Sequence, residues 1–169
     1  MIGFVVVLAL LSPSCYHTPV ASPIIDPFRA PACSFCPGNR GLEYQPVVGS
    51  TVVAAADGVV MFSGVVAGVR YLVVQQSDGR LATYGLLAAA EVVVGAVIRA
   101  GQVIATTTDR FFFGLRQADR YIDPAPFLGS PHYRPRLVPI DGSSPRPAPA
   151  PAMRCGAPTS RVGERAPRR

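Results

Sequence analysis

The chain has 169 residues, of which 49% are hydrophobic and 15% are charged, and this composition suits one folded domain with a packed core. All 16 basic residues are arginines, so every chemistry that needs a lysine is excluded. Histidine is limited to His17 and His132, which excludes a site that needs two neighbouring histidines in one domain. The net charge of +6 belongs to the last 39 residues, because eight arginines balance eight acids over residues 1–130.

The first element in chain order is a short apolar segment. Residues 2–11 carry no charge, and this run is too short to span a bilayer, which takes about 20 residues. Its length is typical of a signal-peptide hydrophobic region, so we predict a signal peptide over residues 1–14 and a protein that is secreted or held in the cell envelope, on the extracellular side of the membrane. A short buried strand is the alternative. Lipidation of Cys15 is a further option, although Pro13 fits lipoprotein signals poorly.

The cysteines predict disulfides. The chain holds four of them, Cys15, Cys33, Cys36 and Cys155. An even number in an exported chain favours two disulfides, and the three pairings remain open. The spacing of Cys33 and Cys36 also occurs in redox-active and zinc-binding motifs. Pro31 and Pro37 place this pair in a loop, however, and the other two cysteines are not spaced as a second zinc-ligand pair. We therefore favour structural disulfides.

Two segments of contrasting proline content follow. Seven prolines within residues 13–46 predict an extended, turn-rich arm over residues 15–36. Residues 47–123 lack proline and alternate short apolar runs with turn residues, a pattern typical of an all-β sandwich or barrel. The expected strands lie within 51–55, 59–62, 71–75, 81–84, 92–94, 97–98, 103–105 and 111–115.

The expected turns are set by short polar and glycine-containing pairs. Asp57-Gly58 and Asp78-Gly79 are strong signals of two-residue hairpins, and Ser63-Gly64 indicates a further turn. Residues 86–91, with the sequence LLAAAE, predict a single helical turn or a loop.

The last segment, residues 130–169, is predicted to be a disordered tail rich in proline and arginine. Nine of the 18 prolines lie in residues 131–169, and such a segment cannot bury enough apolar surface to fold alone. Its arginines could contact an anionic polymer, and a merely solvated tail is the alternative. Nucleic acid is not an expected partner, because the arginines stand singly without interleaved aromatic residues.

Seven segments occur in a characteristic order and spacing. They are IIDPFRAP (24–31), NRGLEY (39–44), GSTVVAAADGVVMFSG (49–64), YLVVQQSDGRLATYGLL (71–87), VVVGAVIRAGQVIATT (92–107), RFFFGLR (110–116) and YIDPAPFL (121–128). Together they resemble the lysostaphin/LytM-type zinc metallopeptidases, which cut peptide cross-links in bacterial peptidoglycan. The resemblance implies a domain over residues 37–129 with the lysostaphin-like fold, a β-sandwich or barrel-sandwich hybrid of short antiparallel strands.

The residues that carry catalysis in that family are replaced in this chain. The resemblance places Asn39, Glu43 and Phe112 at the metal positions, and Leu86 and Arg110 at the positions of two histidines that assist the zinc-bound water. Zinc requires imidazole, thiolate or carboxylate donors, and among the metal positions only Glu43 offers one. We therefore predict no zinc, no other cofactor and no zinc peptidase activity.

The resemblance leads to two functions. The first is an exported, catalytically inactive member of the family, acting as a peptidoglycan or cell-wall binding module or as a regulator of a wall hydrolase. The alternative is an active peptidoglycan endopeptidase with an unrecognised metal or catalytic set. A carrier domain of the lipoyl or biotinyl type is excluded because it needs a lysine.

The former active site has two interpretations, and the first is a groove that still binds a peptide without cutting it. Asn39, Glu43, Tyr84 and Arg110 are its candidate residues. The other interpretation is that Glu43 and Arg110 form an ion pair that only stabilises the filled site.

Overall fold

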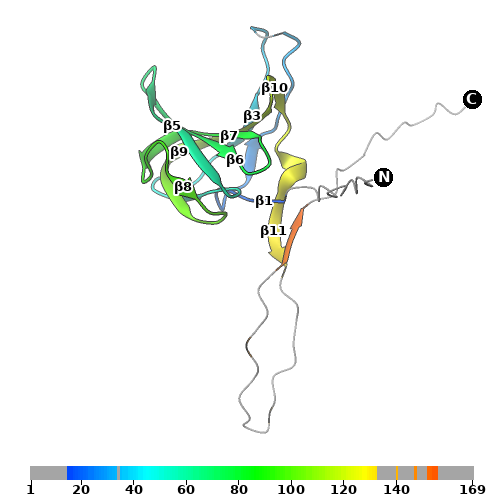
Figure 1. Cartoon of the computed structure of the whole chain (residues 1–169). Coiled ribbons are helices and arrows are strands. Elements are labelled where there is room, and N and C mark those ends of the chain that lie inside the picture. Colours follow the sequence, from blue (N-terminus) through cyan, green and yellow to red (C-terminus); the bar gives the residue numbers. More distant parts are fainter. Residues whose placement is uncertain (1–14, 34, 133–139, 141–146, 148–151, 156–169) are drawn as a thin grey trace, which may run out of the picture.

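The computed structural model describes residues 15–33, 35–132, 140, 147 and 152–155 (Figure 1). The predicted signal peptide therefore lies outside the described residues. Within the described part, strands dominate, and the 3₁₀ helix η1 (Ala125–Phe127) is the one helical element. In this part of the chain no helix has the length and apolar character needed to cross a membrane. The all-β class is confirmed.

The body of the molecule is a nine-stranded sheet with antiparallel pairing throughout. Its strands are β2 (Ile24–Asp26), β3 (Gly41–Tyr44), β4 (Thr51–Val53), β5 (Gly58–Val66), β6 (Val69–Gln76), β7 (Leu81–Ala90), β8 (Val97–Ile98), β9 (Val103–Gln117) and β10 (Arg120–Ile122). The order across the sheet is β2-β3-β9-β7-β6-β5-β8, and β4 and β10 also pair with β9.

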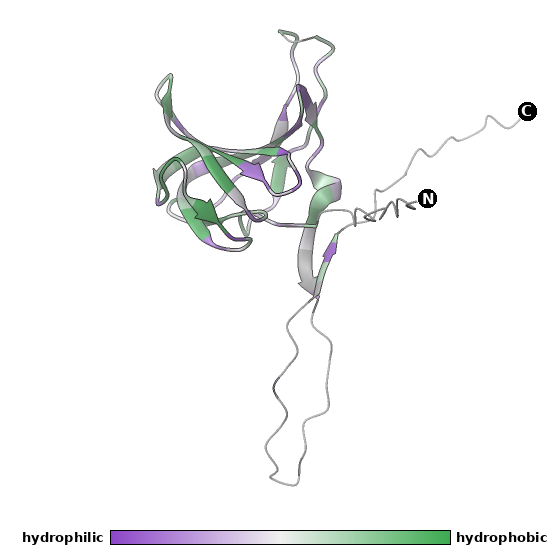
Figure 2. Ribbon diagram, viewed as in Figure 1, coloured by the Kyte–Doolittle hydropathy of each residue, from purple (hydrophilic) through white to green (hydrophobic). Residues whose placement is uncertain are grey.

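Strand β9 organises this sheet, because its 15 residues pair with four other strands. Phe111, Phe113 and Leu115 alternate along it and are fully buried, as the two-residue period of a strand requires. They pack in the core with Tyr44 and Tyr84; the Tyr84 and Phe113 ring centroids lie 5.2 Å apart. Hydrophobic residues recur along the strands of the large sheet (Figure 2).

One of the two predicted hairpins is confirmed, with a loop of residues 77–79 in place of the expected two-residue loop, because the Gln76 N–H bonds to the Arg80 carbonyl. Asp78-Gly79 joins β6 to β7, and Gly79 has a φ of +85°, which glycine adopts without strain. Asp57-Gly58 does not form a hairpin, because β4 pairs with β9 whereas β5 pairs with β6 and β8. The Asp57 carboxylate instead accepts a hydrogen bond of 2.8 Å from the Ala100 N–H, far along the chain.

Three further expectations about local structure are wrong. Ser63-Gly64 lies inside β5, and the hairpin turn is at Ala67-Gly68, where both φ values are positive. Residues 86–90 continue β7 past two bulges, because they pair with β9 and not with a local turn. Residues 92–94 form no strand; the chain turns at Val93–Ala96, with Gly95 at a φ of +85°.

A second, three-stranded sheet joins the two ends of the described chain. It contains β1 (Tyr16–His17), β11 (Leu128–His132) and β12 (Ala152–Cys155) in the order β1-β11-β12. Residues 130–132 and 152–155 fall within the predicted disordered tail, so that prediction does not hold for them. Their backbone groups are paired between β11 and β12, and the disulfide Cys15–Cys155 holds the same ends together.

The disulfides settle the open pairings: Cys15 bonds to Cys155 and Cys33 bonds to Cys36. The sulfur of Cys15 is therefore not available for a lipid thioether in this form of the protein. Two disulfides fit an oxidising compartment.

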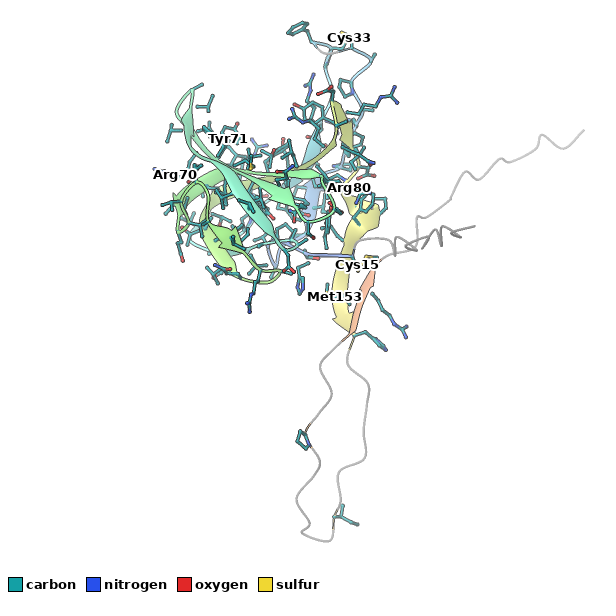
Figure 3. All side chains as sticks on the ribbon, in the orientation of Figure 1. Cys15, Cys33, Arg70, Tyr71, Arg80 and Met153 are labelled. Carbon is teal, nitrogen blue, oxygen red and sulfur yellow. A yellow bond between two sulfur atoms is a disulfide. The ribbon has the colours of Figure 1, made fainter. Side chains whose placement is uncertain are left out.

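A polar contact fastens the small sheet to the body. The Tyr16 hydroxyl donates a hydrogen bond of 2.6 Å to Asp78, which also accepts one of 2.6 Å from Arg80. The Arg80 guanidinium lies 4.5 Å from the centroid of the Phe127 ring, beside the segment that leads into β11 (Figure 3). Burial, followed by the hydrogen bond to Asp78, raises the pKa of Tyr16, so this hydroxyl stays protonated and keeps its role as donor.

Candidate functional site

The candidate site lies on the face of the large sheet opposite the core. Because side chains alternate along a strand, the neighbours of the buried β9 residues, Phe112, Gly114 and Arg116, belong to this outer face. The sheet is curved, and the β5–β6 hairpin and the arm that precedes β3 rise at its two sides (Figure 1). Tyr71 stands on the sheet between these two walls (Figure 3).

The strand register defines the outer face as rows of residues that run across β3, β9, β7 and β6. One row contains Glu43, Phe112, Gly85 and Tyr71, and the next contains Gly41, Gly114, Thr83 and Val73. In the first row Gly85 therefore stands between two aromatic residues, Phe112 and Tyr71.

The rings of Phe112 and Tyr71 occupy the space that a Cβ would need at three glycines of the sheet. A Cβ at Gly41 would come within 2.7 Å of the Phe112 ring, and a Cβ at Gly114 within 2.9 Å of it. A Cβ at Gly85 would come within 2.7 Å of the Tyr71 ring. Real Cβ atoms do not approach other atoms this closely, so the rings of Tyr71 and Phe112 lie flat on glycine backbone and form the floor of a hollow.

We call this hollow the groove. Its volume is about 280 Å³, and its polar and aromatic lining consists of Arg40, Tyr71, Thr83, Phe112, Arg116 and Tyr121. A second, shallower hollow of about 430 Å³ shares Tyr71, Val73 and Thr83 with it and continues toward Phe62 and Val66 on β5. The two hollows adjoin at these shared residues.

The structure brings together four of the five family catalytic positions. Glu43 is paired with Phe112 across β3 and β9, and its carboxylate forms an ion pair with Arg110. Leu86 follows Gly85, the β7 partner of Phe112, and its carbonyl accepts a hydrogen bond of 2.9 Å from the Thr108 hydroxyl. Leu86 has a φ of +61°, a left-handed conformation that is uncommon for leucine.

The side chain of Asn39 serves the backbone of the arm. Its amide nitrogen donates to the carbonyls of Asp26 and Pro27 at 3.3 and 3.2 Å, and its amide oxygen accepts from the Gly41 N–H at 3.3 Å. Asn39 is 6% exposed, so it does not line the groove.

These residues do not fit a zinc ion. The Phe112 and Leu86 side chains have no donor atom, the Asn39 amide is already hydrogen-bonded, and the Glu43 carboxylate is neutralised by Arg110. A zinc site needs three or four nitrogen, sulfur or oxygen donors around one point. Across the described residues no cluster of three or more His, Cys, Asp and Glu side chains could supply them.

The predicted ion pair is present, and its contribution to stability is small. The Arg110 side chain is 53% exposed and that of Glu43 is 22% exposed. Water screens such a surface pair, which contributes about 0–1 kcal/mol. The main consequence of the pair is that the Glu43 carboxylate is already bound to Arg110.

Tyr84 was expected in the groove, and this is wrong. The residue is fully buried in the core, and its hydroxyl accepts a hydrogen bond of 2.8 Å from the Ala55 N–H. It lies on β7 in the same alternation as Ala82, which is also buried. Burial raises the pKa of Tyr84 to about 12.

Several groove residues are not among those predicted from the sequence, namely Tyr71, Arg40, Arg116 and Tyr121. Tyr71 and Tyr121 each lie in a segment quoted for the family resemblance, and Arg116 ends another. Once β9 is aligned with its neighbours, the alternation of Phe111, Phe113 and Leu115 assigns Arg116 to the outer face. The pairing register of the strands, which the sequence alone does not provide, is the information needed to assign these residues to the groove.

The fold and the site together define a curved, antiparallel β-sheet domain with an open groove on its outer face, and its described residues hold no donor set for a metal ion. The model of Peptidase family M23 matches residues 37–124, slightly more than half of the chain, and the chain belongs to this family. No curated protein is similar enough to the chain to count as a match.

Three solved structures illustrate the relationship. Csd3 of Helicobacter pylori is 25% identical over 68% of this chain, with a TM-score of 0.61, and the match covers 35% of Csd3. The catalytic domain of lysostaphin, an antimicrobial peptidase of Staphylococcus simulans, is 19% identical over 63% of this chain and 91% of its own, with a TM-score of 0.55. The SpoIIQ–SpoIIIAH pore-forming complex provides a chain that is 16% identical over 69% of this one and 92% of its own, with a TM-score of 0.59. The last two identities show a shared fold.

The buried hydroxyl of Tyr84 leads to a stability prediction. Tyr84→Phe removes the acceptor of the Ala55 N–H and is expected to lower the free energy of unfolding by about 1–3 kcal/mol. The folded pKa is raised, so the unfolded state loses its proton first. Stability is therefore full below pH 10 and is lost as the pH rises toward 12. Chemical denaturation at pH 8 and pH 11 measures both effects.

Tyr71→Phe, on the outer face, is the matched control. It should leave the free energy of unfolding at pH 8 within about 0.5 kcal/mol of the natural chain, as surface substitutions usually do. If the free energy of unfolding falls equally in the two variants, the hydrogen bond from the Ala55 N–H does not contribute the predicted stability. If Tyr84→Phe steepens the alkaline loss, the sign of the pH argument is wrong.

Proposed function

We propose that this chain is an exported, catalytically inactive M23 domain that binds peptides of peptidoglycan in its groove. In this role it anchors to the cell wall or regulates a wall hydrolase. The observation that carries the proposal is Phe112. By the family resemblance this residue stands at a zinc position, and its ring lies on Gly41 and Gly114 as part of the groove floor. The substitution removes a metal ligand and keeps the peptide-binding surface.

Two features support binding over an inert scaffold. The groove and the adjoining hollow are open to solvent along the outer face, and aromatic rings on such a surface provide large contact areas for a ligand. The Tyr71 ring over Gly85 and the Phe112 ring over Gly114 take up the space that a Cβ would need, so both rings lie close to the sheet. A regulatory role is supported by the fold itself, since one protein with this fold is found in a complex with another protein, SpoIIIAH.

Cosedimentation with insoluble peptidoglycan tests the proposal. The full chain with both disulfides intact should be retained in the pellet, and Tyr71→Ala should reduce retention about tenfold or more, since it removes an aromatic anchor from the groove. The matched control replaces the arginines at 134, 136, 146, 161, 165, 168 and 169 with glutamine. This tail variant should keep its retention in physiological salt.

Two results would contradict the proposal. If the tail variant is released and Tyr71→Ala is retained, the arginines and not the groove bind the wall. If the full chain solubilises peptidoglycan, with zinc bound at one ion per molecule, the chain is an active endopeptidase with a donor set outside the family positions. Thermal unfolding of each variant confirms that the proteins compared are folded.

A further inference from the structure

The groove carries positive charge and no negative charge. Two guanidinium groups, those of Arg40 and Arg116, line it together with three aromatic rings, and no carboxylate is among its lining residues. The nearest carboxylate of the catalytic row, Glu43, is paired with Arg110 and does not line the groove. A hollow of this composition favours an anion with an apolar body.

Both arginines are positioned by the fold. Arg116 stands on β9 between its two register partners, Tyr121 of β10 and Leu81 of β7. Arg40 directly precedes β3; its guanidinium donates a hydrogen bond of 3.4 Å to the Cys36 carbonyl and lies 5.7 Å from the Tyr121 ring centroid. Within the described residues, Arg116 forms no ion pair with a carboxylate. Its charge is therefore open to a ligand.

The guanidinium group matches a carboxylate in shape and can donate two parallel hydrogen bonds to it. The rest of the lining is apolar or aromatic, and its other polar side-chain groups are the hydroxyls of Tyr71, Thr83 and Tyr121. A volume of about 280 Å³ holds a few small residues and not a large polymer. The ligand that matches the guanidinium groups, the apolar lining and the volume is a short peptide with a free carboxylate at its end.

We propose that the groove recognises the C-terminal carboxylate of a peptide through Arg40 and Arg116, with the peptide backbone lying over Tyr71 and Phe112. This inference rests on the proposed function and adds the specificity of that site: a peptide with a free C-terminal carboxylate binds more tightly than a peptide whose end is blocked. The chain's own C-terminal residues are a poor occupant, because residues 156–169 contain four arginines and one acid.

Titration calorimetry on the full, disulfide-intact chain tests the inference. The probes are N-acetyl-trialanine with a free carboxylate and the same peptide as its C-terminal amide. The free acid should bind about tenfold or more tightly than the amide, as charge-assisted hydrogen bonds require. Arg116→Gln should abolish that preference. Arg120→Gln is the matched control, since Arg120 is an exposed residue of β10 outside the groove lining, and it should leave the preference unchanged.

The outcomes separate this inference from the proposed function. Equal binding of the acid and the amide, or no binding of either, overturns carboxylate recognition, while retention on peptidoglycan would still support a wall-binding domain. If acetate displaces the free acid at equal concentration, the groove binds a simple anion and the peptide part of the inference is wrong. If Arg120→Gln removes the preference as Arg116→Gln does, general surface charge is responsible.

Discussion

A fivefold variant of this chain is expected to bind one zinc ion per molecule and to cleave peptidoglycan. The substitutions are Asn39→His, Glu43→Asp, Leu86→His, Arg110→His and Phe112→His. They restore the three metal ligands and the two assisting histidines that the family resemblance assigns to these positions, and zinc then has the donors it requires. Elemental analysis of the purified protein and release of soluble peptidoglycan fragments measure the two gains.

The backbone at positions 43, 86 and 112 is suited to the change. Position 112 is paired with position 43 on one side and with Gly85 on the other, so a histidine and an aspartate would stand on neighbouring strands. Leu86 already has a φ of +61°, and histidine is one of the few residues besides glycine that adopt this conformation readily. The left-handed backbone at position 86 therefore suits a histidine better than the leucine that is present.

Zinc should also stabilise the fivefold variant. A metal that binds only the folded state raises the free energy of unfolding by about 2.7 kcal/mol at a hundred times its dissociation constant. A fourfold variant that keeps Phe112 is the matched control and should gain neither zinc nor stability, because one ligand is missing. A folded fivefold variant that binds no zinc would show that the family positions were assigned wrongly to this chain.

The strands of this fold could be predicted from the sequence where local signals and pairing agree. Asp78-Gly79 lies between two apolar runs that pair with each other, so the hairpin prediction was right. The pair Asp57-Gly58 has the same local signal but joins strands that find their partners elsewhere. Residues 86–90 look helical in isolation, and their pairing with β9 determines their conformation. Tertiary pairing overrides local preference at these places.

For the candidate site, the sequence predicted which residues lie together but not which way their side chains point. The resemblance identified Glu43, Arg110 and Phe112, and they do lie together on the outer face. It did not say which way each side chain points, because a shift of one residue in register sends a side chain to the other face. Tyr84 is in the core for this reason, and Tyr71 was overlooked on the groove floor.

Removal of the disulfide between Cys15 and Cys155 is expected to cost far more stability than removal of the one between Cys33 and Cys36. The first closes a loop with a sequence separation of 140, and the second a loop with a separation of 3. The loss of loop-closure entropy predicts costs of about 5 and about 2 kcal/mol in the free energy of unfolding. Denaturant unfolding of Cys15→Ser/Cys155→Ser and of Cys33→Ser/Cys36→Ser, compared with the natural chain, measures both.

The larger cost has a structural reason beyond chain entropy. Cys15 precedes β1 and Cys155 ends β12, and β11 lies between these two strands, so the bond closes the small sheet across its middle strand. That sheet is fastened to the body by the contact of Tyr16 with Asp78. Loss of the first disulfide should therefore also speed hydrogen exchange in β11, whereas loss of the second should leave it unchanged. Equal costs for the two double variants would mean that β11 and β12 hold together without the bond, and that the small sheet folds as an independent element.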